Sequence, residues 1–208
     1  MNRLTNMMRP SALDALIEFF GRFPGVGMRQ AARFAYYLAD ENKGARAELV
    51  AAITALDRIH RCSDCFRLLN DNEQCPICLD TRRDVSRIAV LEKDANLETF
   101  EHSGAYNGHY CILGGMLSEF GDTDAVCRDR IKRLYERIKH SPQIREVILA
   151  MNATAEGNFT ARYIEKILES VQKARTFKIT RLGRGISTGA EIEYLNRETL
   201  KDALENRR

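Results

Sequence analysis

Four cysteines in the first half of the chain have the spacing of a metal site. They form two Cys-x2-Cys pairs separated by nine residues, namely Cys62, Cys65, Cys75 and Cys78. Two thiolates this close can bind one centre from a tight turn, and two such turns complete a tetrahedron. Because all four ligands are protein thiolates, no position stays open for water, and we expect a structural Zn²⁺ ion. An iron–sulfur cluster uses the same ligand type and is the alternative.

The segment 23–35, between two predicted helices, contains residues suited to binding phosphate. Gly25 and Gly27 permit a hairpin tight enough to expose backbone N–H groups beside a helix N-terminus, which attracts phosphate. Arg29 and Arg33, four residues apart on the following helix, lie on one face near the same phosphate. This is the pattern of a helix–hairpin–helix that binds DNA regardless of sequence, and a plain helical hairpin is the alternative.

A third candidate site combines acidic and neutral residues at the ends of predicted strands. Glu92 ends one strand, and Asn152, Thr154 and Glu156 follow a later one. Toprim folds place a glutamate and an Asp-x-Asp pair at these strand ends, where they hold magnesium for phosphodiester chemistry. Here Asn152 and Thr154 are neutral, whereas hard divalent cations prefer charged oxygen ligands. The pattern resembles a Toprim scaffold that has lost its catalysis.

The excess positive charge of the chain is located near its N-terminus. The net charge is +3, and residues 1–39 contain five arginines against Asp14 and Glu18, which accounts for all of it. A localised positive field suits contact with a polyanion, and chance scatter of surface charge is the alternative. A second basic run lies on a predicted helix, where we expect a solvated face rather than a DNA contact. It comprises Arg128, Arg130, Lys132, Arg133, Arg137 and Lys139.

Two kinds of periodicity predict the elements that position these residues. Early in the chain, helical periodicity predicts helices at 11–20, 29–38 and 45–60. Ser11 is the expected N-cap of the first helix, and His60 is expected to end the third. One face of that third helix carries Leu49, Ile53, Leu56 and Ile59.

From residue 86, apolar strands alternate with helices, which predicts a mainly parallel sheet covered on both faces. The predicted strands are 87–92, 110–113, 146–150, 177–182 and 191–195, with helices at 123–140 and 159–174.

Composition excludes several classes of protein. The 208 residues are 44% hydrophobic and 29% charged, which is enough to bury a core. No apolar run approaches the ~18 residues that a membrane span requires, and the N-terminus lacks a signal-peptide pattern. We therefore expect a soluble intracellular protein with reduced thiols. Cys111 and Cys127 are expected to be small buried hydrophobes, and 183–189 a turn rather than a nucleotide loop.

The order of these parts resembles the bacterial RecR recombination-mediator family over nearly the whole chain. The supporting strings are at 24–27, 75–78, 112–115, 146–150, 160–164 and 193–194. The chain departs from the family pattern at Met28-Arg29-Gln30, where Pro-Lys-Ser is usual, and at Asn158, where a second glutamate is usual. Further departures lie at 117–120 and 186–190.

This resemblance implies a non-enzymatic protein of recombinational DNA repair in the bacterial cytoplasm, associated with the nucleoid. Members of the family form homo-oligomeric clamps, as dimers or tetrameric rings, on single- and double-stranded DNA. They act with RecO, and in many bacteria RecF, to promote RecA loading at gaps. Arg29 and Arg33 match the family's basic pair, and the four cysteines match its zinc ligands. Glu156, together with Glu92, matches acidic positions that serve partner docking.

We therefore predict an α+β chain of four parts. These are a helix-hairpin-helix DNA-binding region at 1–61, a C4-type zinc finger at 62–78, a Toprim-like α/β domain at 86–182, and a C-terminal strand-and-helix oligomerisation arm at 183–208. Two other functions remain open on the residues alone. One is a magnesium-dependent Toprim nuclease, primase or topoisomerase-like enzyme, against which Asn152 and Thr154 argue. The other is a zinc-ribbon adaptor that contacts only protein.

Overall fold

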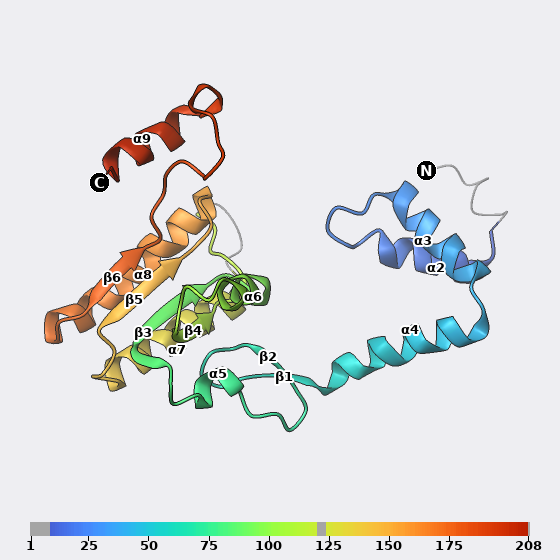
Figure 1. Ribbon diagram of the computed structural model, residues 1–208. Coiled ribbons are helices and arrows are strands. Elements are labelled where there is room, and N and C mark those ends of the chain that lie inside the picture. Colours follow the sequence, from blue (N-terminus) through green and yellow to red (C-terminus); the bar gives the residue numbers. More distant parts are fainter. Residues whose placement is uncertain (1–8, 120–123, 208) are drawn as a thin grey trace. The chain divides into compact units, whose positions relative to one another are not determined.

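The computed structural model describes residues 9–119 and 124–207. The chain divides between Ile59 and His60 into two compact units, which Figure 1 shows. The first unit is helical. The second contains the cysteine cluster, a four-stranded sheet with its helices, and a C-terminal helix. This mixture of helices with a parallel sheet confirms the predicted fold class.

Helices α2 (Ser11–Phe20) and α3 (Met28–Asp40) form the core of the first unit. Ala31 and Ala35, one turn apart on α3, are fully buried, and Ile17 of α2 is nearly so. Because alanine has the smallest side chain that still favours a helix, the two helices can approach closely along this face. Their contact holds the intervening hairpin between two fixed ends.

The helix caps differ in part from the sequence prediction. Helix α2 begins at Ser11, but Pro10 occupies the cap position and no side chain caps the helix, so the prediction of Ser11 as N-cap is wrong. Helix α4 (Lys43–Ala55) does have a side-chain cap, because Asn42 accepts the Ala45 N–H at 2.9 Å.

The third predicted helix, 45–60, is wrong at its C-terminal end. A 3-10 turn, η1 (Leu56–Arg58), follows α4, and the chain then enters strand β1 (Ile59–Arg61), which pairs with β2 (Leu68–Asn70). His60 therefore lies in a strand rather than at a helix end. The predicted helix ends early because residues 59–61 pair with β2, and this pairing closes the loop that carries Cys62 and Cys65.

The predicted apolar face of this segment is exposed. None of the residues of α4 is buried. The exposed fractions are 39% for Leu49, 55% for Ile53, 60% for Leu56 and 37% for Ile59.

All four strands of the main sheet are parallel, as predicted. Their order is β4 (Gly108–Ile112), β3 (Asp84–Leu91), β5 (Glu146–Ala150) and β6 (Lys178–Arg181). The central strand β3 is buried continuously from Ile88 to Leu91, which explains its unbroken apolar sequence. Strand β4 forms one edge of the sheet.

Helices cover both faces of this sheet. Tyr110 bonds Glu101 on α6 (Asp94–Ser103), whereas the next residue, Cys111, points to the opposite face, since successive strand residues alternate. That opposite face carries α7 (Ala125–His140) and α8 (Ala155–Ala174), which contact each other. Cys111 and Cys127 are buried, as predicted, and burial raises the pKa of their thiols to about 12 and about 11.

The C-terminal segment differs from its predicted form. Residues 191–195 are not a strand but contain a 3-10 turn, η2 (Ile192–Tyr194), and helix α9 (Arg197–Glu205) follows. Ile192 and Tyr194 are 70% and 79% exposed, so burial against a sheet does not favour extended backbone here. Helix α9 confirms the helix predicted in the C-terminal arm, whereas helix α6 has no counterpart in the sequence prediction.

Candidate metal centre and nucleic-acid interface

The four cysteines of the predicted metal site lie together. Cys62 and Cys65 lie in the loop between β1 and β2, and Cys75 and Cys78 flank the start of helix α5 (Pro76–Leu79). All four Sγ atoms lie within 4.8 Å of one another, and two of the separations are 3.7 and 3.8 Å. A tetrahedral ion with Zn–S bonds of about 2.3 Å needs sulfur atoms about 3.8 Å apart. The cluster therefore fits a metal ion of this size.

The electrostatics of the cluster also favour a cation. Hydrogen bonding from Cys65 lowers the pKa of the Cys75 thiol, and bonding to Cys75 raises the pKa of Cys65. A group of thiols this close therefore cannot all ionise without a cation to balance their charge. The backbone N–H of Asp64 lies 3.4 Å from the Cys62 Sγ, and such donors stabilise thiolate charge.

The loop between β1 and β2, residues 62–67, is the metal-binding loop, and it is attached to the edge of the Toprim-like sheet. The Ile112 N–H, on the open side of β4, donates to the Cys65 carbonyl at 2.9 Å. Arg137 of α7 donates to the carbonyls of Asp64 and Tyr110, both at 3.1 Å. Hydrogen bonds to backbone carbonyls therefore join the cysteine loop to the edge strand β4, in addition to side-chain packing.

Arg130 adds a second link between loop and sheet. It is 7% exposed, donates to the Ile112 carbonyl at 3.1 Å, and lies over the Phe66 ring at 5.3 Å from its centre. The predicted solvated basic face of α7 is therefore wrong for Arg130 and Arg137. Their positions carry a signal for this, because they share the helical stripe of the buried residues Cys127, Ile131, Leu134 and Ile138.

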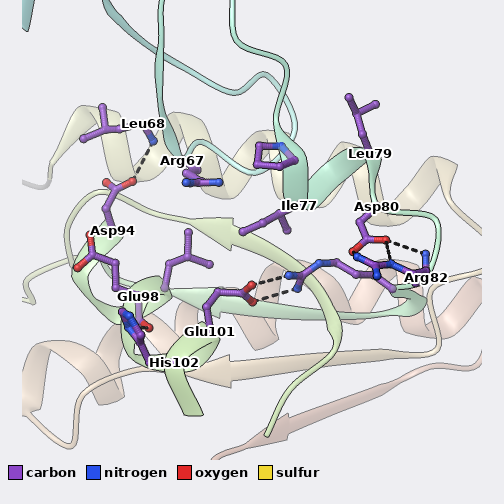
Figure 2. A pocket seen from close by; sticks show the side chains of 13 residues that line it. Arg67, Leu68, Ile77, Leu79, Asp80, Arg82, Asp94, Glu98, Glu101 and His102 are labelled. Atoms are coloured by element: carbon purple, nitrogen blue, oxygen red, sulfur yellow. Dashed lines mark hydrogen bonds and ion pairs between the residues drawn. The ribbon is translucent and has the colours of Figure 1, made fainter. Parts of the chain in front are cut away.

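A hollow lies between the cysteine-bearing segment, from Arg67 to Arg83, and helix α6 (Figure 2). Its volume is about 690 Å³. Three of its four carboxylates are already engaged. Asp94 accepts the Leu68 N–H, Asp80 accepts the Arg82 guanidinium, which lowers the pKa of Asp80 to about 2, and Glu101 pairs with Arg83. Carboxylates held in this way are poorly placed to serve as general acid and base.

The hairpin between α2 and α3 presents unbonded backbone amides. Gly25 has φ +77°, a left-handed conformation that L residues rarely adopt, so glycine is required there. Gly27 is the N-cap of α3 with φ −79°, which any residue can adopt, and no atom lies within 4 Å of a Cβ built on it. Within the described chain, the N–H groups of Gly25, Gly27, Met28 and Arg29 have no hydrogen-bond acceptor.

In the basic stretch 1–39, Arg29 and Arg33 are the described arginines whose side chains form no ion pair and can bind a phosphate. Arg9 pairs with Asp14 and Arg22 with Glu18, and Arg3 lies outside the described residues. Arg29 and Arg33 are exposed on α3, and neither bonds a described residue. The hairpin belongs to the first unit and the metal cluster to the second, and within each unit the structure brings the members of its own set together.

The candidate residues at the end of the sheet are held by structural bonds. Asn152, after β5, donates to the Glu92 carboxylate, after β3, at 2.5 Å. Thr154 caps α8 by accepting the Gly157 N–H at 3.1 Å. Glu156 is exposed in the first turn of α8. The Asn152 amide thus bonds the Glu92 carboxylate, the group that would have to bind magnesium in a Toprim enzyme. The Toprim enzyme alternative is therefore not favoured.

Among the described residues, no helix combines the length and the apolar character needed to cross a membrane.

Comparisons with known proteins agree with this geometry. Family profiles described as "RecR, helix-hairpin-helix", "Toprim domain" and "RecR, C-terminal" match residues 13–56, 86–183 and 185–208. Proteins named "Recombination protein RecR" match nearly end to end. The one from Lactobacillus helveticus is 38% identical over 202 residues, which cover 97% of this chain and 98% of the relative. The one from Syntrophobacter fumaroxidans is 39% identical over 201 residues, covering 95% and 96%. The matched hairpin, sheet and C-terminal segment, together with these relatives, establish that the chain belongs to the RecR family of recombination proteins.

Proposed function

We propose that this protein is a non-enzymatic recombination mediator that binds DNA without reading its sequence. The observation that carries the proposal is the hairpin of the first unit. Three consecutive N–H groups without acceptors, from Gly27 to Arg29, lie at the N-terminus of α3 together with the unpaired guanidinium groups of Arg29 and Arg33. The Gly25 N–H, in the turn before the helix, also lacks an acceptor among the described residues. Amides at a helix N-terminus bind phosphate oxygens, and phosphate is the same at every base pair.

The proposal extends to assembly. We expect a homo-oligomeric clamp in which the exposed apolar face of α4 and the C-terminal arm are interfaces. Val50 on the first and Ile192 and Tyr194 on the second are 63–79% exposed, and large exposed apolar groups in series are typical of protein–protein contacts. We also propose that the chain is divided into functional parts, with a zinc finger at 62–78, a Toprim-like domain at 86–182 and an oligomerisation arm at 183–208.

The metal and the partners complete the proposal. Zn²⁺ is the proposed ion, since a closed set of four thiolates suits it and leaves no site for catalysis. Glu156, exposed in α8, and Glu92, which follows β3 and accepts from Asn152, are the proposed acidic docking residues. RecO, and RecF where present, are the proposed partners, acting with this protein in the cytoplasm to promote RecA loading at gaps.

The salt dependence of binding tests the proposal. The full chain should bind duplexes of unrelated sequence with equal affinity, and the same should hold among unrelated single strands. For duplex DNA, the logarithm of the affinity should fall by about 0.9 per phosphate contact for each tenfold increase in salt concentration. Light scattering on the same samples checks the oligomeric state with and without DNA. A chain that is folded and metal-loaded yet binds no DNA at low salt would exclude this function and favour the zinc-ribbon adaptor.

Two glycine substitutions separate the conformational role of the hairpin from its contact with phosphate. Gly25→Ala should destabilise the hairpin by about 1–2 kcal/mol, because φ +77° places the added Cβ against the backbone. Gly27→Ala should leave the fold intact and still weaken DNA binding, since the added methyl group stands where a phosphate approaches. Amide hydrogen exchange in α3 and DNA affinity measure the two effects. Wild-type affinity in Gly27→Ala would show that phosphate does not approach this amide.

A further inference from the structure

A basic groove runs between the metal-binding loop and helix α7 of the second unit. Two adjoining hollows of about 450 and 470 Å³ make up this groove and share four lining residues. The shared residues are Ser63, Phe66, Asp129 and Arg133. Both walls belong to the second unit, and they are joined by the Arg137 hydrogen bond to the Asp64 carbonyl and by the contact of Arg130 with the Phe66 ring. The groove is therefore a fixed feature of this unit.

The lining of this groove is predominantly cationic. Five basic residues line it against three acidic ones. The basic residues are Arg61, Arg130, Lys132, Arg133 and Arg137, and the acidic ones are Asp64, Asp129 and Glu136. Helix α7 as a whole contains six lysines and arginines and two acidic residues, so its field adds to that of the groove.

The basic residues of the groove fall into two groups. Arg61, Arg130 and Arg137 donate to backbone carbonyls within the unit, so their charges are held in place. Lys132 is exposed and bonds no described residue. Within the described part of the chain, Arg133 pairs only with Asp129 one turn earlier, and both side chains are about 60% exposed. Exposed pairs of this kind contribute little stability and can exchange for a stronger anion.

We propose that this groove is a second contact for the nucleic-acid backbone, in which Lys132 and Arg133 bind phosphate. Arg130 and Arg137 supply fixed positive charge behind these two side chains, whereas the charge of Arg61 is balanced by its ion pair with Asp94. This inference rests on the proposed function, because it gives the DNA a contact on the second unit in addition to the hairpin of the first. The groove contributes no base-specific donor or acceptor pattern, so the contact adds affinity and salt dependence but no sequence preference.

The test compares the full-length chain with a double variant, Lys132→Gln with Arg133→Gln. Loss of two duplex contacts should reduce the slope of log affinity against log salt by about 1.8, so the wild type's fall in affinity between 50 and 200 mM salt should shrink by about tenfold in the variant. The control is Arg162→Gln with Lys166→Gln, which likewise removes two exposed cations, here from α8, and neither of these side chains bonds a described residue. The control should keep the wild-type slope.

The outcomes distinguish this inference from the proposed function. If the wild type binds no DNA, the proposed function fails and the groove proposal fails with it. If the wild type binds DNA and the groove variant has the wild-type slope of log affinity against log salt, the hairpin function stands and the groove proposal is wrong. The basic groove would then be suited to binding an acidic protein instead. Asp129→Asn gives a check of opposite sign. It frees Arg133 without removing a cation, and it should tighten binding, whereas weaker binding would contradict the proposal.

Discussion

A double variant with Arg29→Glu and Arg33→Glu is expected to lose measurable DNA binding while keeping its fold and its metal. Each substitution removes a cation and places an anion beside the amides of the hairpin, where the phosphate would lie. Neither arginine side chain bonds a described residue, so the folded state loses no hydrogen bond or ion pair within the described chain. A glutamate in the first turn of α3 even favours the helix dipole. The loss should therefore appear in binding and not in stability.

Binding isotherms at low salt, with circular dichroism and metal content as checks of the fold, measure this effect. The control is Arg162→Glu with Lys166→Glu, which changes the total charge by the same amount on exposed positions of α8. If both double variants weaken binding equally, the effect is one of total charge and the hairpin is not the site. If only the Arg29 and Arg33 variant fails to bind, the hairpin contact is supported.

Removal of the metal should have the largest effect on stability. Structural zinc sites of this kind contribute about 10–16 kcal/mol of binding free energy to folding. Chelation, or Cys65→Ser, should unfold the loop and helix that carry the cysteines. Because the Ile112 N–H bonds the Cys65 carbonyl and Arg137 bonds the Asp64 carbonyl, the damage should reach the edge strand β4.

Amide hydrogen exchange at Ile112 measures this coupling directly. Its protection should fall on chelation, whereas that of Leu149, in a strand interior to the sheet, should remain. Elemental analysis of the purified protein identifies the metal and distinguishes zinc from iron. Cys127→Ala is the control, since Cys127 is buried outside the cluster and its loss should leave the metal content unchanged. Unchanged protection at Ile112 after complete metal loss would show that the loop does not support the strand.

Features that depend on neighbours in sequence could be predicted without the structure. The cysteine spacing predicted a cluster, and all four Sγ atoms do lie within 4.8 Å of one another. Unbroken apolar runs predicted a parallel sheet, and the strand 146–150 was predicted with its observed bounds. Helix α2 likewise spans the predicted 11–20. In each case the cause is local, since turn geometry, helix period and strand burial act over a few residues.

Tertiary structure decided the features whose partners lie far apart in the chain. Arg137 bonds Asp64, which is 73 residues away, and Asn152 bonds Glu92 across 60 residues. Neither pairing has a spacing that sequence could reveal, and the first turns an apparently solvated basic helix into the support of the metal-binding loop. Residues 191–195 have the alternating pattern of a strand, but no strand among the residues that the structure describes pairs with them, and they contain a 3-10 turn instead. Local pattern determines which element is favoured, and long-range contacts determine whether that element and its side chains find a partner.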